Sequence, residues 1–230
     1  MAPVPDFQSF ALAQLGFGRI YAIDTSHELL TELEARRQKS PELPIHTRAA
    51  DMLTLCNVVA PGSVAVAVCM GDTLTHLPSL EDVRHLFSAV ATVLVRGGIF
   101  ILTWRDLTPE LTGTDRFIPV RSSEDKIMTC FLEYTSPISV QVHDLVYTRD
   151  PGGRSWTLAK SSYSKLCLSP AQIATELAAA SLTVDPLGTA RVFRSLWLTR
   201  RALNPSQSHK MLSARTCRLI RNCSSWRTVG

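Results

Sequence analysis

Two aspartates stand where consecutive apolar runs end, and carboxylates at such positions can bind a nucleoside. Asp24 follows residues 19–23, and Asp51 follows the weaker strand candidate at residues 44–49. A carboxylate at the end of the second strand of a nucleotide-binding α/β unit can accept hydrogen bonds from both ribose hydroxyls. Asp24 alone is also typical of a helix cap. Two acids at successive strand ends favour a nucleoside ligand, with Met52 as an apolar cover for its base.

The most specific motif is VCMGDTLTHL at residues 68–77. Gly71 directly follows a nearly uninterrupted apolar run, and a glycine there lets the backbone approach a ligand closely. The carboxyl edge of the strands is where open α/β sheets bind their ligands. The motif therefore predicts a ligand contact at Met70 and Gly71.

These residues are positioned by alternating strands and helices. Apolar spacing and caps predict helices over about 7–15, 26–39 and 80–94. Strands are expected at 19–23, 44–49, 62–70 and 99–104, and the last two are apolar enough to be covered on both faces. This alternation predicts an α/β fold with a doubly wound, mainly parallel sheet.

The rhythm changes after residue 126. Strand patterns at 130–134, 140–148 and 156–164 are separated by turn signals, which predicts an antiparallel β-hairpin insertion over 127–168. Ser169-Pro170 then begins a helix that runs to about Ala180. A closing strand pair is expected at 182–185 and 192–198. We expect one domain over residues 1–201 and a basic, disordered tail over 202–230.

Charge and cysteine spacing narrow the function classes. The last 32 residues hold seven of the 24 basic residues and no acid, so the rest of the chain is mildly acidic, which argues against a globular nucleic-acid-binding surface. The six cysteines form no CxxC pair, so reduced thiols are expected and no metal site is predicted. No apolar run is long enough for a membrane span, and a cytoplasmic location is expected.

Several motifs, in order, resemble class I S-adenosylmethionine-dependent methyltransferases. RIYAIDTSHELL is similar to that family's strand-two motif, AADMLTL to its adenine-side motif, and VLVRGGIFILTW to the segment along strand five. VCMGDTLTHLP resembles the strand-four motif of glycine N-methyltransferase-like and related small-molecule enzymes. The later YSKLCLSPAQIATELAAASL is similar to the family's C-terminal part. The resemblance implies a Rossmann-like methyltransferase fold.

The resemblance also implies roles for particular residues. Asp24, with Thr25 beside it, would bind the ribose of S-adenosylmethionine, and Asp51 and Met52 its adenine. Met70 and Gly71 would contact the methionine part of the cofactor. These assignments come from the positions of the motifs.

Methyl transfer is promoted mainly by positioning, sometimes with a general base. His76 is the best-placed base, and Asp72 can orient an amine acceptor. A histidine packed at a helix start is the plainer interpretation of His76. Tyr134, Tyr147 and Trp156 are candidates for a substrate cavity, although packing on the sheet is the favoured role for all three.

The sequence departs from the family at its beginning. Counting back from the first helix, the positions of the family's GxGxG loop fall on Ala2, Val4 and Asp6, and the first strand that precedes this loop has no counterpart. We therefore expect the first strand and the glycine-rich loop to be missing or degraded, with catalysis reduced or absent in this chain.

The leading hypothesis is an S-adenosylmethionine-dependent methyltransferase that acts on an N or O atom of a small molecule. The alternative is a non-catalytic, methyltransferase-like binding module that has lost the cofactor site. A nicotinamide oxidoreductase is disfavoured because the chain has no GxGxxG. RNA methylation guided by the basic tail ranks last.

Overall fold

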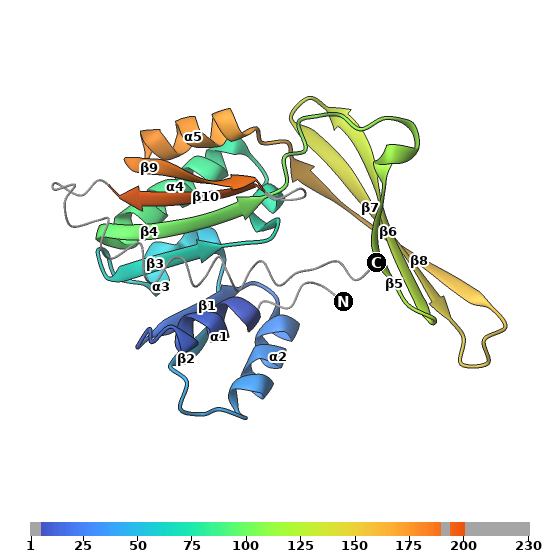
Figure 1. Ribbon diagram of the computed structural model, residues 1–230, viewed down its shortest axis with the longest axis horizontal. Helices are drawn as coiled ribbons and strands as arrows, with labels where there is room; N and C mark the ends of the chain where they lie inside the picture. The colour runs from blue at the N-terminus through green and yellow to red at the C-terminus, as the bar shows by residue number, and fades with distance from the viewer. Residues whose placement is uncertain (1–5, 190–193, 201–230) are drawn as a thin grey trace.

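The computed structural model describes residues 6–189 and 194–200, in which two α/β sheets stand beside a separate antiparallel sheet (Figure 1). The first part of the chain forms α1 (Asp6–Gln14), β1 (Ile20–Asp24), α2 (His27–Arg37), β2 (Ile45–Ala49), η1 (Met52–Thr54) and α3 (Leu55–Val58). It is followed by β3 (Val64–Cys69), η2 (Thr73–His76), α4 (Leu80–Val93) and β4 (Leu94–Trp104). The predicted alternation of strands and helices is therefore confirmed.

The second part of the chain contains the insertion and the closing elements. It forms η3 (Gly113–Arg116), β5 (Phe117–Ser122), β6 (Lys126–Ser136), β7 (Ser139–Arg149), β8 (Trp156–Leu166), α5 (Pro170–Ala179), β9 (Leu182–Thr189) and β10 (Arg194–Arg200). The start predicted for the last strand falls on residues 192–193, outside the described residues, as does the predicted tail at 202–230.

The α/β part consists of two sheets. β1 and β2 pair in parallel, and β3 and β4 pair in parallel in a second sheet with the order β3-β4-β10-β9. β10 runs antiparallel to both β4 and β9. The parallel pairs and the crossover helices agree with the predicted doubly wound fold, although in the described residues β1 and β3 are not paired with each other.

The antiparallel insertion is confirmed and is larger than predicted. Its order is β5-β6-β7-β8, and it begins at Phe117 instead of residue 127. β5 has little signal in the sequence. Its exposed and partly buried residues do not alternate, and Pro119 lies next to a shift in the register of its pairing with β6. The sheet stands to one side of the α/β sheets (Figure 1).

The main core lies between β4 and the helices α4 and α5. Phe87 and Val90 of α4 and Phe100 of β4 are almost fully buried, and the two phenylalanine rings meet edge to face. Ser79 caps α4 by accepting a hydrogen bond from Asp82 N at 3.1 Å. Ser169 does the same for α5, with Pro170 as the first helical residue, as predicted.

One expectation about burial is wrong. The apolar β3 was predicted to be covered on both faces, yet none of its six residues is buried and Ala65 is exposed. β4, its neighbour in the sheet, has Phe100, Ile101 and Leu102 buried. Among the described residues β3 has a strand partner on one side only, which is β4.

Among the helices that the structure describes, none is long and apolar enough to cross a membrane.

Candidate functional site

A cavity of about 1000 Å³ lies between the two α/β sheets. Every residue of β1 and of β3 lines it, and it continues past the carboxyl end of β3 to Met70, Gly71, Asp72 and His76. Tyr163 and Lys165 of β8 also line it. Its volume is at the upper end of the range of small-molecule sites.

Asp24 lies at the carboxyl end of β1 and lines this cavity. Its Oδ1 accepts a hydrogen bond from Ser26 N at 2.8 Å, which fixes the carboxylate at the turn into α2. The helix cap itself is Ser26, which accepts from Leu29 N at 3.3 Å. Asp24 is therefore not the cap, and its position suits a ligand with neighbouring hydroxyl groups.

The adenine-side residues are separated by the structure. Met52 lines the cavity, whereas Asp51 is exposed and lies outside the cavity lining. The Asp51 Oδ1 accepts from Leu53 N at 2.8 Å and so caps the short helix η1. Thr25 is also exposed and outside the lining. Of these three residues, only Met52 is brought to the cavity.

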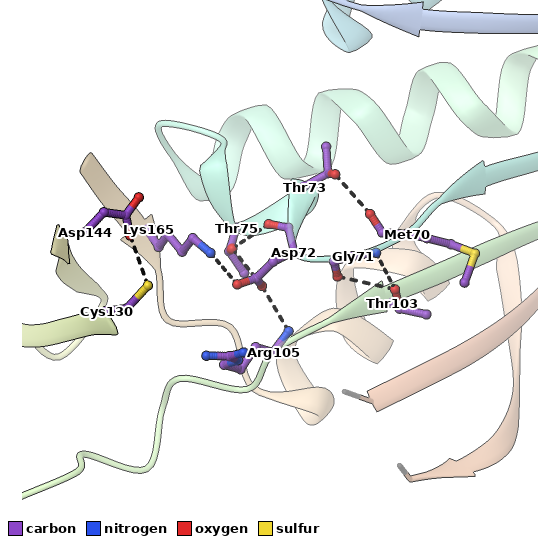
Figure 2. A network of polar contacts seen from close by, with 10 residues as sticks. All are labelled: Met70, Gly71, Asp72, Thr73, Thr75, Thr103, Arg105, Cys130, Asp144 and Lys165. Carbon is purple, nitrogen blue, oxygen red and sulfur yellow. Dashed lines mark hydrogen bonds and ion pairs between the residues drawn. The ribbon is translucent and has the colours of Figure 1, made fainter. Parts of the chain in front are cut away.

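Gly71 forms the bend that leaves β3. Its φ of +78° is left-handed, and a Cβ built on it would meet nothing within 4 Å, so conformation and not space requires a glycine here. The Gly71 N–H donates to Thr103 Oγ1 of β4 at 2.8 Å (Figure 2). The bend is thereby fixed to the neighbouring strand, with Met70 beside it at the cavity.

Asp72 is the centre of a polar network that joins the α/β part to the antiparallel sheet (Figure 2). Its Oδ2 contacts Lys165 Nζ, and its Oδ1 accepts from Arg105 N at 3.1 Å and from Thr75 Oγ1 at 3.0 Å. The side chains of Asp72 and Lys165 are 17% and 10% exposed. Two segments 93 residues apart are therefore held by one nearly buried ion pair.

The charge of Asp72 is fixed by these partners. Burial raises the pKa of the carboxyl, but the Lys165 ammonium and the hydrogen bonds from Lys165, Arg105 and Thr75 outweigh burial. The resulting pKa lies below the ordinary value for aspartate. Asp72 is therefore a carboxylate at neutral pH.

His76 lies at the end of η2, and its ring packs on Tyr163, with 5.1 Å between the ring centroids. Burial lowers the pKa of the imidazole, and the positive charge of Lys165 lowers it further, against the opposing charges of Asp72 and Asp144. The ring is therefore neutral at pH 7. A neutral imidazole at a cavity wall can accept a proton.

Four residues at or near the site were not identified as site residues from the sequence. Thr103 holds the Gly71 bend, and Tyr163 and Lys165 of β8 line the cavity. Asp144 lies on β7, the strand paired with β8. Asp144 accepts from Cys130 Sγ at 3.0 Å and contributes, after burial, to raising the pKa of Tyr163. One sequence feature could have identified Lys165. It directly precedes the apolar run Leu166–Cys167–Leu168, which is buried, so a charged residue there is expected to have a partner.

The three aromatic candidates lie elsewhere. Tyr134, Tyr147 and Trp156 are outside the cavity lining. Tyr134 donates from its hydroxyl to Pro109 O at 3.3 Å, and Trp156 is 43% exposed. All three lie in strands of the antiparallel sheet. Tyr134 packs against the core of that sheet, as favoured from the sequence, whereas Tyr147 and Trp156 are exposed.

Comparison with known proteins agrees with this arrangement. The model of a family described as "Methyltransferase domain" matches residues 5–102, which contain both β1 and the Gly71 bend. The fold is the Rossmann-like methyltransferase fold. A search of curated proteins found no match.

Solved structures share this methyltransferase fold at low sequence identity. An S-adenosylmethionine-dependent methyltransferase from Clostridium acetobutylicum ATCC 824 is 16% identical, with 80% of this chain and 75% of that chain covered and a TM-score of 0.64. The CcbJ methyltransferase from Streptomyces caelestis is 16% identical, with 84% of this chain and 78% of that chain covered and a TM-score of 0.69. The sugar N-methyltransferase KedS8 from Streptoalloteichus sp ATCC 53650 is 14% identical, with 87% of each chain covered and a TM-score of 0.60.

Proposed function

We propose that this chain is an S-adenosylmethionine-dependent methyltransferase that acts on an N or O atom of a small molecule. The observation that carries the proposal is that Asp24 and the Met70–Gly71 bend, which belong to different sheets, line one cavity. The matching methyltransferase family and the methyltransferase fold support S-adenosylmethionine as the cofactor. One of the similar structures, CalS10, is described with S-adenosylmethionine bound.

The residues present at the cavity fit the nucleoside side of this cofactor. Asp24 uses one carboxylate oxygen for Ser26 N and has a second oxygen for ribose hydroxyls. Met52 would cover the adenine, and Met70 and Gly71 would lie along the methionine part. When bound, the cofactor supplies a methyl group on a positively charged sulfur.

The chain's own residues supply position and a base. The neutral His76 ring can take the proton of an acceptor hydroxyl or ammonium group, because its pKa is lowered and it lines the cavity. Asp72 has three polar partners of its own. We therefore assign Asp72 a positioning role, in which it holds Lys165 and η2 at the cavity, in place of the direct contact with an amine that the sequence suggested.

We infer the class of methyl acceptor from proteins of similar structure. KedS8 is described as a sugar N-methyltransferase, and CalS10 as an amino pentose methyltransferase. A small-molecule acceptor is consistent with a cavity that Tyr163 and Lys165 close from the antiparallel sheet. Fold alone does not determine the substrate. Tyr163 and Lys165 are the residues of that sheet that an acceptor in the cavity would meet.

A second candidate function is a non-catalytic binding module. The observation that favours it is the separation of β1 from β3, which leaves the centre of the nucleoside site without a strand in the described residues. The sequence positions expected for the glycine-rich loop, Ala2 and Val4, lie outside the described residues, and Asp6 begins α1.

Isothermal titration calorimetry with S-adenosylmethionine distinguishes the two functions. The methyltransferase proposal expects micromolar binding that Asp24→Ala weakens by about 10- to 100-fold, because hydrogen bonds to a charged group contribute about 1.5–3 kcal/mol each. Glu28→Ala is the matched control, since Glu28 is an exposed acid four residues further along the chain and lies outside the cavity lining. Absence of binding at millimolar cofactor would favour the non-catalytic module.

A further inference from the structure

The end of β8 contacts both ends of the short helix η2. Lys165 of β8 forms the ion pair with Asp72, which precedes η2, and the Tyr163 ring packs on His76, the last residue of η2. Tyr163 and Lys165 are two residues apart on one strand, so their side chains lie on the same face of the sheet. Two contacts to a single strand therefore determine where η2 lies against it.

The His76 imidazole is held by packing. Within the described residues its two ring nitrogens have no hydrogen-bond partner. The centroid of the Tyr163 ring lies 5.1 Å away, with 30° between the two ring planes, which is in the range of aromatic contacts. A histidine that works as a base is usually oriented by a hydrogen bond to its second nitrogen. At His76 the contact with the Tyr163 ring is the interaction that can take this role.

Tyr163 is itself anchored in the antiparallel sheet. It pairs with Val142 of β7, and its ring packs on the buried cluster that contains Val142. Asp144 lies two residues further along β7, on the same face of the sheet. Cys130 Sγ donates to Asp144 Oδ1 at 3.0 Å. The ring that contacts His76 is therefore supported from the side of the sheet.

One lysine takes part in both contacts between β8 and η2. Lys165 Nζ lies 5.6 Å from the centroid of the Tyr163 ring, within the range of a cation–π contact, and it also binds Asp72. Thr75 of η2 donates to Asp72 Oδ1 at 3.0 Å (Figure 2). These contacts form a closed cycle that leaves η2 at one end and returns to it at His76.

We propose that Tyr163 is the positioning residue of His76, and that its ring, not its hydroxyl group, holds the imidazole at the cavity wall. This inference rests on the proposed function, in which His76 takes a proton from the methyl acceptor. A fixed imidazole keeps one ring nitrogen at a constant place for the acceptor, and such positioning contributes to rate. Burial and the charge of Asp144 raise the pKa of the Tyr163 phenol, so Tyr163 is not a second base at neutral pH.

NMR of the full chain with labelled histidine rings tests the contact without a substrate. The chain has six histidines, and the spectrum of His76→Gln assigns the His76 signals. Tyr163→Phe keeps the ring and Tyr163→Leu removes it. Tyr147→Leu is the matched control, because Tyr147 is exposed on the opposite face of the same sheet. Ring-to-ring contacts and ring-current shifts of His76 should be lost only in Tyr163→Leu.

The titration of His76 gives a second measurement. Burial has the largest effect on the imidazole and lowers its pKa, and the charged groups that act on it are Lys165, Asp72 and Asp144. Removing the Tyr163 ring admits water to the imidazole, so Tyr163→Leu should raise the pKa of His76 toward the ordinary value of about 6.5. Tyr163→Phe should keep the pKa low.

Two outcomes would overturn the proposal. One is a folded Tyr163→Leu variant whose His76 signals and pKa match those of the wild type. The other is a Tyr163→Phe variant that changes them as much as Tyr163→Leu, which would assign the role to the hydroxyl group. If urea unfolding shows that Tyr163→Leu is not folded, Tyr163→Met, with a flexible side chain and no ring, replaces it.

The proposed function is tested separately. Absence of cofactor binding in calorimetry would contradict the methyltransferase proposal and would leave the ring contacts and the titration of His76 unchanged.

Discussion

Asp72 and Lys165 form an ion pair that connects the bend after β3 to the end of β8. One residue comes from the α/β part and the other from the antiparallel insertion, and both line the cavity. The pair therefore fixes the part of the cavity wall where the bend after β3 meets the end of β8 (Figure 2). The insertion therefore contributes two residues, Tyr163 and Lys165, to the cavity lining.

Removing the lysine charge should destabilise the fold. Lys165→Met keeps most of the side-chain length but leaves Asp72 nearly buried without its cation, which is expected to cost about 3 kcal/mol in the free energy of unfolding. Lys160→Met on the same strand is the control, because Lys160 is exposed and should cost little. Urea unfolding at pH 7 measures both variants, and equal effects would contradict the role of the pair.

The same pair predicts a dependence of stability on pH. The pKa of Asp72 is lower in the folded chain than in the unfolded chain, so the carboxylate stabilises the fold above its ordinary pKa of about 3.9. That stabilisation is lost as pH falls through the lowered folded value. The difference in unfolding free energy between wild type and Lys165→Met should therefore shrink below about pH 4. A difference that stays constant from pH 7 to pH 3 would show that Asp72 is not the responsible group.

His76 predicts the pH dependence of any methyl transfer that uses it as a base. Because the pKa of the ring is lowered, the neutral form persists at pH 7 and is lost only below the ordinary imidazole value of about 6.5. The rate constant of methyl transfer should therefore be independent of pH near neutrality and decrease at acidic pH. His76→Gln should reduce it about a hundredfold or more and remove that acid limb. An unchanged acid limb in the variant would exclude His76 as the base.

Gly71 and Gly97 form a matched pair of left-handed glycines. Their φ values are +78° and +74°, and a Cβ at either position would meet nothing within 4 Å. Alanine at each should therefore cost a similar amount, about 1–2 kcal/mol of backbone strain. Only Gly71 lines the cavity, so only Gly71→Ala should also weaken binding of S-adenosylhomocysteine. Comparable weakening by Gly97→Ala would show that the effect is a general loss of stability.

Local patterns in the sequence were enough to predict most helices and strands. The serine caps and apolar spacing of α4 and α5 were visible, and so was the strand that carries the Gly71 bend. β5 escaped prediction because a proline and a register shift obscure its alternation. These features are local, so a single sequence contains them.

Long-range pairing could not be predicted in the same way. Lys165 reaches Asp72 across 93 residues, and Thr103 reaches Gly71 across 32 residues, so neither contact has a local signal. The apolar pattern of β3 indicated a covered strand, whereas the structure leaves its residues partly exposed beside the cavity. The composition of a strand indicates which surroundings suit it, but it does not show whether another element covers that strand.

Hydrogen exchange with mass spectrometry, with and without S-adenosylhomocysteine, tests most directly whether the cofactor binds at the carboxyl ends of β1 and β3. We predict slower exchange in the segments 22–27 and 69–75, which contain Asp24 and Gly71, with no change in the β6–β7 hairpin around Ser136. Unchanged exchange in both segments at saturating ligand, or slowing confined to other regions, would contradict it.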